Sequence, residues 1–112
     1  MLERLDGLFG TRNRTDVLVA LRLLGETYPS ELAALLKLRV FSVQRVLESL
    51  ESAGVVVSRL AGRTRLVTLS PRFFASKELD ALLWALGKQD IELQKKLATR
   101  RRRPRRAGKP GL

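Results

Sequence analysis

The sequence predicts a mainly α-helical fold that carries one small β-hairpin. Within residues 30–53, apolar side chains recur at intervals of three and four, as in Leu32, Leu35 and Leu36, which places them on one helical face. Directly after this stretch, two β-prone runs flank a glycine-bearing turn, a pattern typical of a hairpin. Leucines recur again with helical spacing between residues 79 and 97. Since 112 residues can bury one modest core, these elements are expected to form a single small domain.

The first elements are predicted to be an arm and a helix. Residues 1–13 are expected to form a short helix or arm, followed by a helix from about Arg14 to Leu24 that is capped by Thr11 or Asn13. The inward side chains of that helix are expected to be Val17, Leu18, Leu21 and Leu24, and Gly25 is its stop signal. The connector that follows, residues 26–29, is a candidate for a short edge strand beside the later hairpin.

The centre of the chain predicts two short helices packed across a tight turn, the first capped by Ser30. The second, from about Val40 to Ala53, is expected to bury Val43, Val46, Leu47 and Leu50 and to leave a polar outer face of Ser42, Gln44, Arg45, Glu48 and Ser49. Arginine and glutamine can pair bidentately with guanine and adenine edges in a major groove. A helix with such a face, held across a preceding helix, has the geometry of a recognition helix.

The hairpin is predicted from residues 55–60 and 65–69, joined by the turn 61–64. Gly54, directly before it, is expected to be a left-handed C-terminal cap. Period two on the second strand places Val67 and Leu69 on the same face as Arg63 and Arg65. We expect the valine end to pack on the helices and the arginine end to project beyond them as a wing.

The order and spacing of these segments resemble prokaryotic winged helix-turn-helix transcription regulators, both stand-alone ones and modules that precede minimal nucleotidyltransferase domains. The likeness covers roughly residues 5 to 86 and rests on Glu31-Leu32-Ala33, Leu38, Ser42-Val43-Gln44-Arg45-Val46-Leu47, Leu50-Glu51, Ala53-Gly54-Val55-Val56, Leu8-Phe9-Gly10-Thr11-Arg12, Gly62-Arg63-Thr64-Arg65-Leu66, Leu69-Ser70-Pro71 and Glu78-Leu79. It departs at Lys37, where the family usually has glycine. The resemblance implies a three-helix core, a wing and a C-terminal helix.

Four parts are therefore expected along the chain: an arm at 1–13, a winged helix-turn-helix domain at 14–72, a C-terminal helix at 73–97 and a disordered basic tail at 98–112.

The positive charge is concentrated in two places. Residues 95–112 contain nine lysines and arginines and no acid, whereas the other 94 residues carry 13 bases and 11 acids. Among those 94, residues 37–72 have seven bases and two acids. This uneven placement is the footprint of a phosphate-binding surface and predicts duplex DNA as partner. The predicted DNA-binding residues are Lys37, Arg39, Ser42, Gln44, Arg45, Ser49, Arg63, Arg65, Arg100, Arg101, Arg102 and Arg103.

The C-terminal helix predicts a homodimer, since a palindromic DNA site needs a two-fold protein. Leu79, Leu83, Leu86 and Leu93 fall at heptad positions and are the predicted dimerisation residues. Because Gly87 and Asp90 interrupt the pattern, this segment is either one bent rod or two shorter helices. Trp84 is expected to be an anchor in the core or at an interface.

Catalysis finds little support in the composition. The chain contains no histidine and no cysteine, its acids are scattered singly, and no glycine-rich phosphate loop is present. We therefore expect neither an enzyme nor a metal or other cofactor. No apolar run approaches the ~18 residues of a membrane span, and the expected location is the cytoplasm, with the nucleoid.

Two other functions remain open. Winged helices also serve as assembly surfaces, so the chain could be a protein-interaction module such as the antitoxin half of a two-component pair. Alternatively, the arginine-rich tail could be the principal binder of an RNA- or ribosome-associated protein. At the residue level, Arg45 could simply pair with Glu48, and Phe41 is either a staple at the start of its helix or a contact for a thymine methyl group.

Overall fold

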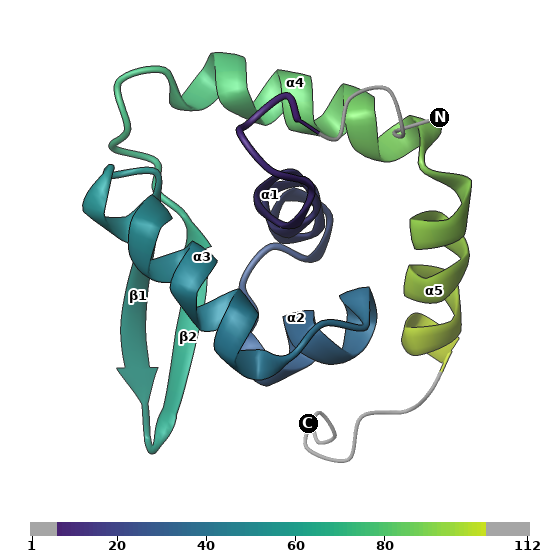
Figure 1. Cartoon of the computed structure of the whole chain (residues 1–112), viewed down its shortest axis with the longest axis horizontal. Helices are drawn as coiled ribbons and strands as arrows, with labels where there is room; N and C mark the ends of the chain where they lie inside the picture. Colours follow the sequence, from purple (N-terminus) through teal and green to yellow (C-terminus); the bar gives the residue numbers. More distant parts are fainter. Residues whose placement is uncertain (1–6, 103–112) are drawn as a thin grey trace.

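The computed structural model describes residues 7–102, with the side chains of residues 7–99. Its elements are α1 (Arg12–Leu24), α2 (Pro29–Leu36), α3 (Val40–Ser52), β1 (Val56–Ala61), β2 (Thr64–Leu69), α4 (Ser76–Gln89) and α5 (Ile91–Arg102). Figure 1 shows α1 nearly end-on at the centre, with α4, α3, α2 and α5 arranged around it and the hairpin extending away from the helices. The predicted fold class, mainly α with one hairpin, is confirmed.

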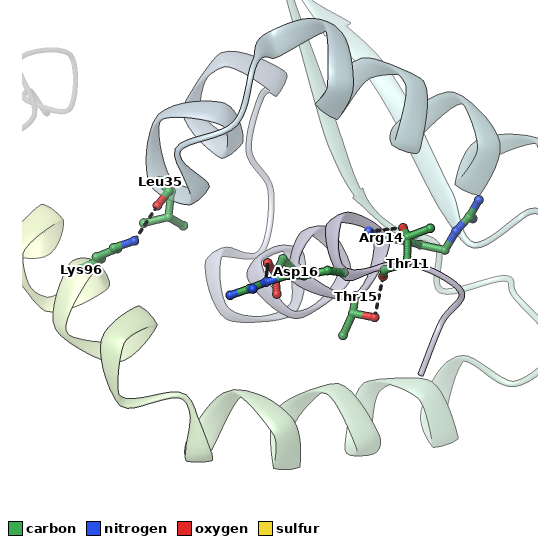
Figure 2. Close-up of polar contacts among 7 residues, drawn as sticks. Thr11, Arg14, Thr15, Asp16, Leu35 and Lys96 are labelled. Atoms are coloured by element: carbon green, nitrogen blue, oxygen red, sulfur yellow. Dashed lines mark hydrogen bonds and ion pairs between the residues drawn. The ribbon is translucent and has the colours of Figure 1, made fainter. Parts of the chain in front are cut away.

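Helix α1 is central because its middle is apolar on every side. Five consecutive residues, from Val17 to Leu21, are all buried, and a helix that is apolar all round belongs inside a core. Thr11 is the N-terminal cap, since its Oγ1 accepts from the backbone N–H of Arg14 at 3.1 Å (Figure 2). Gly25 ends the helix with a φ of 79°, as predicted.

The start of α2 differs from the prediction. Tyr28 is the N-cap and Pro29 the first helical residue, so Ser30 already lies inside the helix and the prediction of a Ser30 cap was wrong. The physical reason is that the proline ring fixes a helical φ, which favours proline at the first helical position. Helix α2 ends at Lys37, which adopts the left-handed conformation with a φ of 58°.

The turn between α2 and α3 therefore uses a lysine where the resembling family usually has glycine. A side chain at positive φ is strained, by roughly 1–2 kcal/mol. In return, the turn places the N–H of Leu38 3.0 Å from the carbonyl oxygen of Ala33, and Leu38 packs against the core as expected of a corner residue.

The hairpin follows α3 after Gly54, which has the predicted left-handed conformation with a φ of 81°. Strands β1 and β2 pair antiparallel, from Val56 opposite Leu69 to Ala61 opposite Thr64. Thr27 adds the candidate edge strand as a single bridge to Val67, with N–H···O distances of 3.0 and 2.7 Å. The root of the hairpin is thus fixed to the connector before α2.

The C-terminal segment forms two helices. Asp90 separates them and caps the second, since its Oδ1 accepts from the backbone N–H of Leu93 at 3.1 Å. Helix α4 packs across α1 (Figure 1), and at Gly87 an added Cβ would lie 2.9 Å from a methyl carbon of Leu23. Glycine, costly within a helix, thus allows the close approach of α4 to α1.

Helix α5 is fixed to α2. Leu93 and Leu97 are buried in the core, and Lys96 Nζ donates to the carbonyl oxygen of Leu35 at 3.4 Å (Figure 2). That oxygen lies in the last turn of α2, where carbonyls lack intrahelical partners and attract cations. The helix continues to Arg102, past the predicted start of the tail at residue 98. Alanine and arginine favour helix, and the buried Leu97 anchors this turn; residues 103–112 lie outside the described part.

The predicted dimerisation leucines are largely used within the chain. Leu83, Leu86 and Leu93 are buried in the hydrophobic core, and Leu79 is partly buried against it. These side chains are not available to a second copy. The heptad spacing was read correctly as one apolar helical face, but tertiary packing turns that face toward the core.

Candidate nucleic-acid interface

Helix α3 separates its side chains into two faces. Val43, Leu47 and Leu50 are buried beneath the helix. The opposite face borders an open groove of about 390 Å³, lined by Phe41, Gln44, Arg45, Glu48, Ser49 and Ser52. The structure thus brings three of the predicted DNA-binding residues, Gln44, Arg45 and Ser49, together on one surface.

Arg45 and Gln44 are both exposed. No ion pair joins Arg45 to Glu48 in the described structure; instead the guanidinium carbon of Arg45 lies 5.6 Å from the centre of the Phe41 ring, within range of a cation–π interaction. Phe41 is 66% exposed, so it is not a staple packed on the core. Its place four residues before Arg45 indicates a shared helical face, a signal present in the sequence although Phe41 was not among the predicted DNA-binding residues.

The two serines predicted to contact DNA are less accessible than Gln44 and Arg45. Ser42 and Ser49 are both half-buried, and Ser49 Oγ accepts a hydrogen bond from Arg14 Nη2 at 2.7 Å. This bond joins the first turn of α1 to the recognition helix and holds it across the body of the domain. Sequence reasoning missed Arg14, because nothing in local spacing connects residues 35 positions apart.

The start of α3 is electropositive without being capped. Arg39 is the N-cap residue, no side chain caps the helix, and its first turn contains no acid. The free N–H groups and the helix dipole favour an anion at this end. Lys37 and Arg39 are both exposed immediately before it, so three sources of positive potential converge.

The wing contains cations of two kinds. Arg63 lies exposed in the turn of the hairpin, next to Gly62. Arg65, by contrast, forms an ion pair with Glu51, with Nη2 and Oε1 2.5 Å apart, and Ser58 Oγ donates to the same carboxylate at 2.9 Å. Because Glu51 of α3 neutralises its charge, Arg65 stabilises the position of the wing on α3. Its predicted contact with DNA stays a prediction.

The other arginine of the strands is also paired. Arg59 Nε and Nη2 each donate to the Glu26 carboxylate at 2.9 Å. These hydrogen bonds lower the pKa of Glu26 below its ordinary value, and the positive charge of Arg59 adds to the effect. Reciprocally, the hydrogen bond from Glu26 raises the pKa of Arg59. Of the lysines and arginines between residues 37 and 65, those without an acidic partner in the described structure are therefore Lys37, Arg39, Arg45 and Arg63.

A second groove, of about 600 Å³, joins the recognition helix to the wing. It is lined by Tyr28, Pro29, Ser30, Val40, Gln44, Thr64 and Arg65, from the starts of α2, α3 and β2. Gln44 borders both grooves. The exposed surface is thus continuous from α3 to the hairpin.

The remaining predictions concern the C-terminal arginines and metal binding. Residues 100–102 belong to the end of α5, and Arg103 lies outside the described residues. Within residues 7–102, no group of three or more potential metal-ligating side chains is found. No helix in that part combines the length and apolar character needed to cross a membrane.

These features define a winged helix-turn-helix protein: two helices across a tight turn, the second with an exposed polar face, followed directly by a hairpin. A comparison with solved structures supports this class. The chain is similar to a mutant form of MarR from E. coli, with a TM-score of 0.60 and 26% sequence identity, over 89% of this chain and 79% of that chain. The winged-helix fold is thereby confirmed, and the similarity suggests a winged-helix transcription regulator.

No protein-family model matches the chain, and comparison with curated protein sequences gives no match. The narrower resemblance to modules that precede nucleotidyltransferase domains stays a prediction.

Proposed function

We propose that this protein is a DNA-binding transcription regulator that reads duplex DNA with α3 and contacts the backbone with the wing tip. The observation that carries the proposal is the distribution of unpaired cations. No acidic partner is found among the described residues for Lys37 and Arg39 at the corner before α3, for Arg45 on the outer face of α3, or for Arg63 at the wing tip. Arg59 and Arg65 on the strands are neutralised. Free positive charge along this surface is suited to a polyanion.

Sequence reading is assigned to Gln44 and Arg45. Both are exposed on the outer face of α3, and both can form bidentate hydrogen bonds with purine edges in the major groove. Lys37, Arg39 and Arg63 are better suited to phosphates, since they lie at the corner and the wing tip, where the duplex backbone passes on either side of the groove. The arginines at residues 100–103 add sequence-independent phosphate binding.

The test is a pair of binding measurements with each of two variants. A binding site is first selected from a random duplex pool, and affinities are measured for that site and for an unrelated duplex. Arg45→Ala is expected to lose ~1–3 kcal/mol on the selected site and much less on the unrelated one. Lys88→Ala, on the exposed face of α4, removes the same charge at a distance from α3 and is expected to affect both duplexes little.

Equal losses on the two duplexes for Arg45→Ala would contradict base reading by this residue. A failure of the intact chain to bind any duplex at physiological salt would remove the proposed function. Preference for structured RNA in the same assay would favour the RNA-associated alternative, and a stoichiometric protein partner without DNA affinity would favour the interaction module.

We also propose that the protein pairs as a homodimer, through apolar side chains other than the buried leucines. Leu82 and Trp84 on α4 and Ile91 at the start of α5 are exposed, with 67% of Ile91 accessible. Exposed large apolar side chains on neighbouring helices favour an interface. Leu82→Glu with Ile91→Glu is expected to shift sedimentation at tens of micromolar toward the monomer, whereas Leu60→Glu on the hairpin should not. A strict monomer for the native chain would end this part of the proposal.

A further inference from the structure

We infer that Phe41 and Arg45 act as one reading unit for a two-base step in which thymine lies beside guanine. This inference rests on the proposed function, because it assigns a base preference to the same face of α3. It extends that function by adding Phe41 as a specificity-determining residue and by naming the chemical group that Phe41 recognises, the C5-methyl group of a pyrimidine.

Position on the helix is the first argument. Phe41, Arg45, Glu48 and Ser52 follow one another at intervals of four, three and four, so they form a single line along the outer face of α3. All four are exposed. Phe41 lies in the first turn, and recognition helices present mainly their N-terminal residues to base edges. The ring is therefore placed where a base contact is expected.

The second argument is the exposure of the ring. Phe41 has 66% of its surface accessible. It is the single aromatic residue in a groove otherwise lined by Gln44, Arg45, Glu48 and two serines. Burial of an apolar ring lowers the free energy, and two thirds of this ring remain uncovered although the Arg45 guanidinium lies over it. In the major groove the apolar group available to it is the thymine methyl, which phenylalanine is able to contact.

The third argument is the distance between the two side chains. The Arg45 guanidinium carbon lies 5.6 Å from the ring centre, so the cation–π contact couples their positions. Base pairs are stacked ~3.4 Å apart, and the edges of neighbouring bases are also displaced across the groove. Side chains coupled at this separation can therefore contact adjacent base pairs, Arg45 through the O6 and N7 of guanine and Phe41 through the methyl of the next thymine.

The experiment removes one methyl group from the DNA. In the selected duplex, the guanine read by Arg45 is identified as the position whose preference disappears in selection with Arg45→Ala. The neighbouring thymine is then replaced by deoxyuridine, which differs only in lacking the methyl. The native chain is expected to bind the thymine duplex about fourfold more tightly, the equivalent of ~0.8 kcal/mol for one buried methyl-sized group.

Phe41→Ala should bind the thymine and deoxyuridine duplexes equally while still preferring guanine at the Arg45 position. Val40→Ala is the matched control: it shortens an exposed apolar side chain of the same helix turn that borders the other groove, and it should retain the fourfold ratio. Because Phe41 is exposed, its replacement is expected to leave thermal unfolding nearly unchanged, which verifies that the variant is folded.

Equal binding of thymine and deoxyuridine by the native chain would overturn the inference, as would a fourfold ratio that persists in Phe41→Ala. So would a selected site with no thymine beside the Arg45-dependent guanine. In each of these cases the intact chain still binds a specific duplex and the proposed function stands. If selection enriches no sequence at all, the proposed function itself fails.

Discussion

Replacing Gly87 by alanine tests whether the close approach of α4 to α1 is a real constraint. In a helix interior, alanine is more favourable than glycine by ~1 kcal/mol, so helix propensity alone predicts a stabilised protein. The structure predicts the opposite. An alanine Cβ would lie 2.9, 3.0 and 3.1 Å from Cδ2, Cδ1 and Cγ of Leu23, well inside the ~3.5–4.0 Å of an ordinary carbon contact.

The magnitude follows from which Leu23 atoms are involved. Both methyl carbons and the branch carbon are close, so rotating the methyl groups does not relieve the overlap, and either Leu23 or α4 must shift. Overpacking of this kind costs ~1–3 kcal/mol. After subtracting the gain in helix propensity, we expect Gly87→Ala to lower the free energy of unfolding by about 0–2 kcal/mol.

The assay is urea unfolding followed by far-ultraviolet circular dichroism, with Gly87→Ala measured in the native and in the Leu23→Ala background. Truncating Leu23 removes all three close atoms, so in that background the alanine should stabilise by ~1 kcal/mol. The sign of the effect should thus reverse between backgrounds, with a coupling energy of roughly 1–3 kcal/mol, the cost of the overpacking. Stabilisation by ~1 kcal/mol in the native background would refute the packing argument.

Three further predictions follow from residues described above. Lys37→Gly should raise the free energy of unfolding by about 1 kcal/mol, because glycine adopts the positive φ without strain, and the urea midpoint should rise. The same variant should weaken binding to the selected and the unrelated duplex alike, since it removes a proposed phosphate contact. An unchanged urea midpoint would contradict the strain at this position. The pKa of Glu26 is lowered in the folded state, so its bond to Arg59 stabilises the fold above the ordinary pKa of 4.5 and is lost as the pH falls through the lowered pKa. Glu26→Gln should therefore unfold more readily than the native chain at pH 7 and equally readily at pH 2. A difference in stability that does not change with pH would oppose this. Deleting residues 103–112 leaves α5 intact and removes four basic residues. The slope of the logarithm of the DNA-binding constant against the logarithm of the salt concentration should then flatten by up to ~0.9 for each phosphate that the shortened chain no longer neutralises. An identical slope would show that this segment does not contribute to DNA binding.

The helices and the hairpin could be predicted from the sequence because their signals are local. The helix expected from about Val40 begins at that residue, and Gly25 and Gly54 end helices as expected, since periodicity and left-handed caps involve neighbours only. The error at Ser30 arose because two local signals competed, and the fixed φ of Pro29 prevailed over the capping preference of serine.

The charge pattern of the site could be predicted only in part, because pairing depends on residues far apart in the chain. Arg59 and Arg65 look equivalent to Arg63 in the sequence, yet contacts with Glu26 and Glu51 neutralise the first two. Likewise, the leucine spacing of α4 and α5 identifies an apolar face without saying whether that face meets the same chain or another. Tertiary contacts decide both questions, and local spacing does not contain them.

The backbone bridge between Thr27 and Val67 fixes the hairpin partway along its length, so the end near the helices is held more firmly than the tip. Three residue pairs, from Arg59 opposite Leu66 to Ala61 opposite Thr64, extend beyond this bridge, over roughly 10 Å at ~3.3 Å per residue. The ion pairs of Arg59 with Glu26 and of Arg65 with Glu51 brace part of that length. The turn that contains Arg63 lies beyond both ion pairs, so we expect local bending of the hairpin to move this turn more than the strands. If α3 reads bases as proposed, the tip can then adjust to the groove while α3 keeps its position.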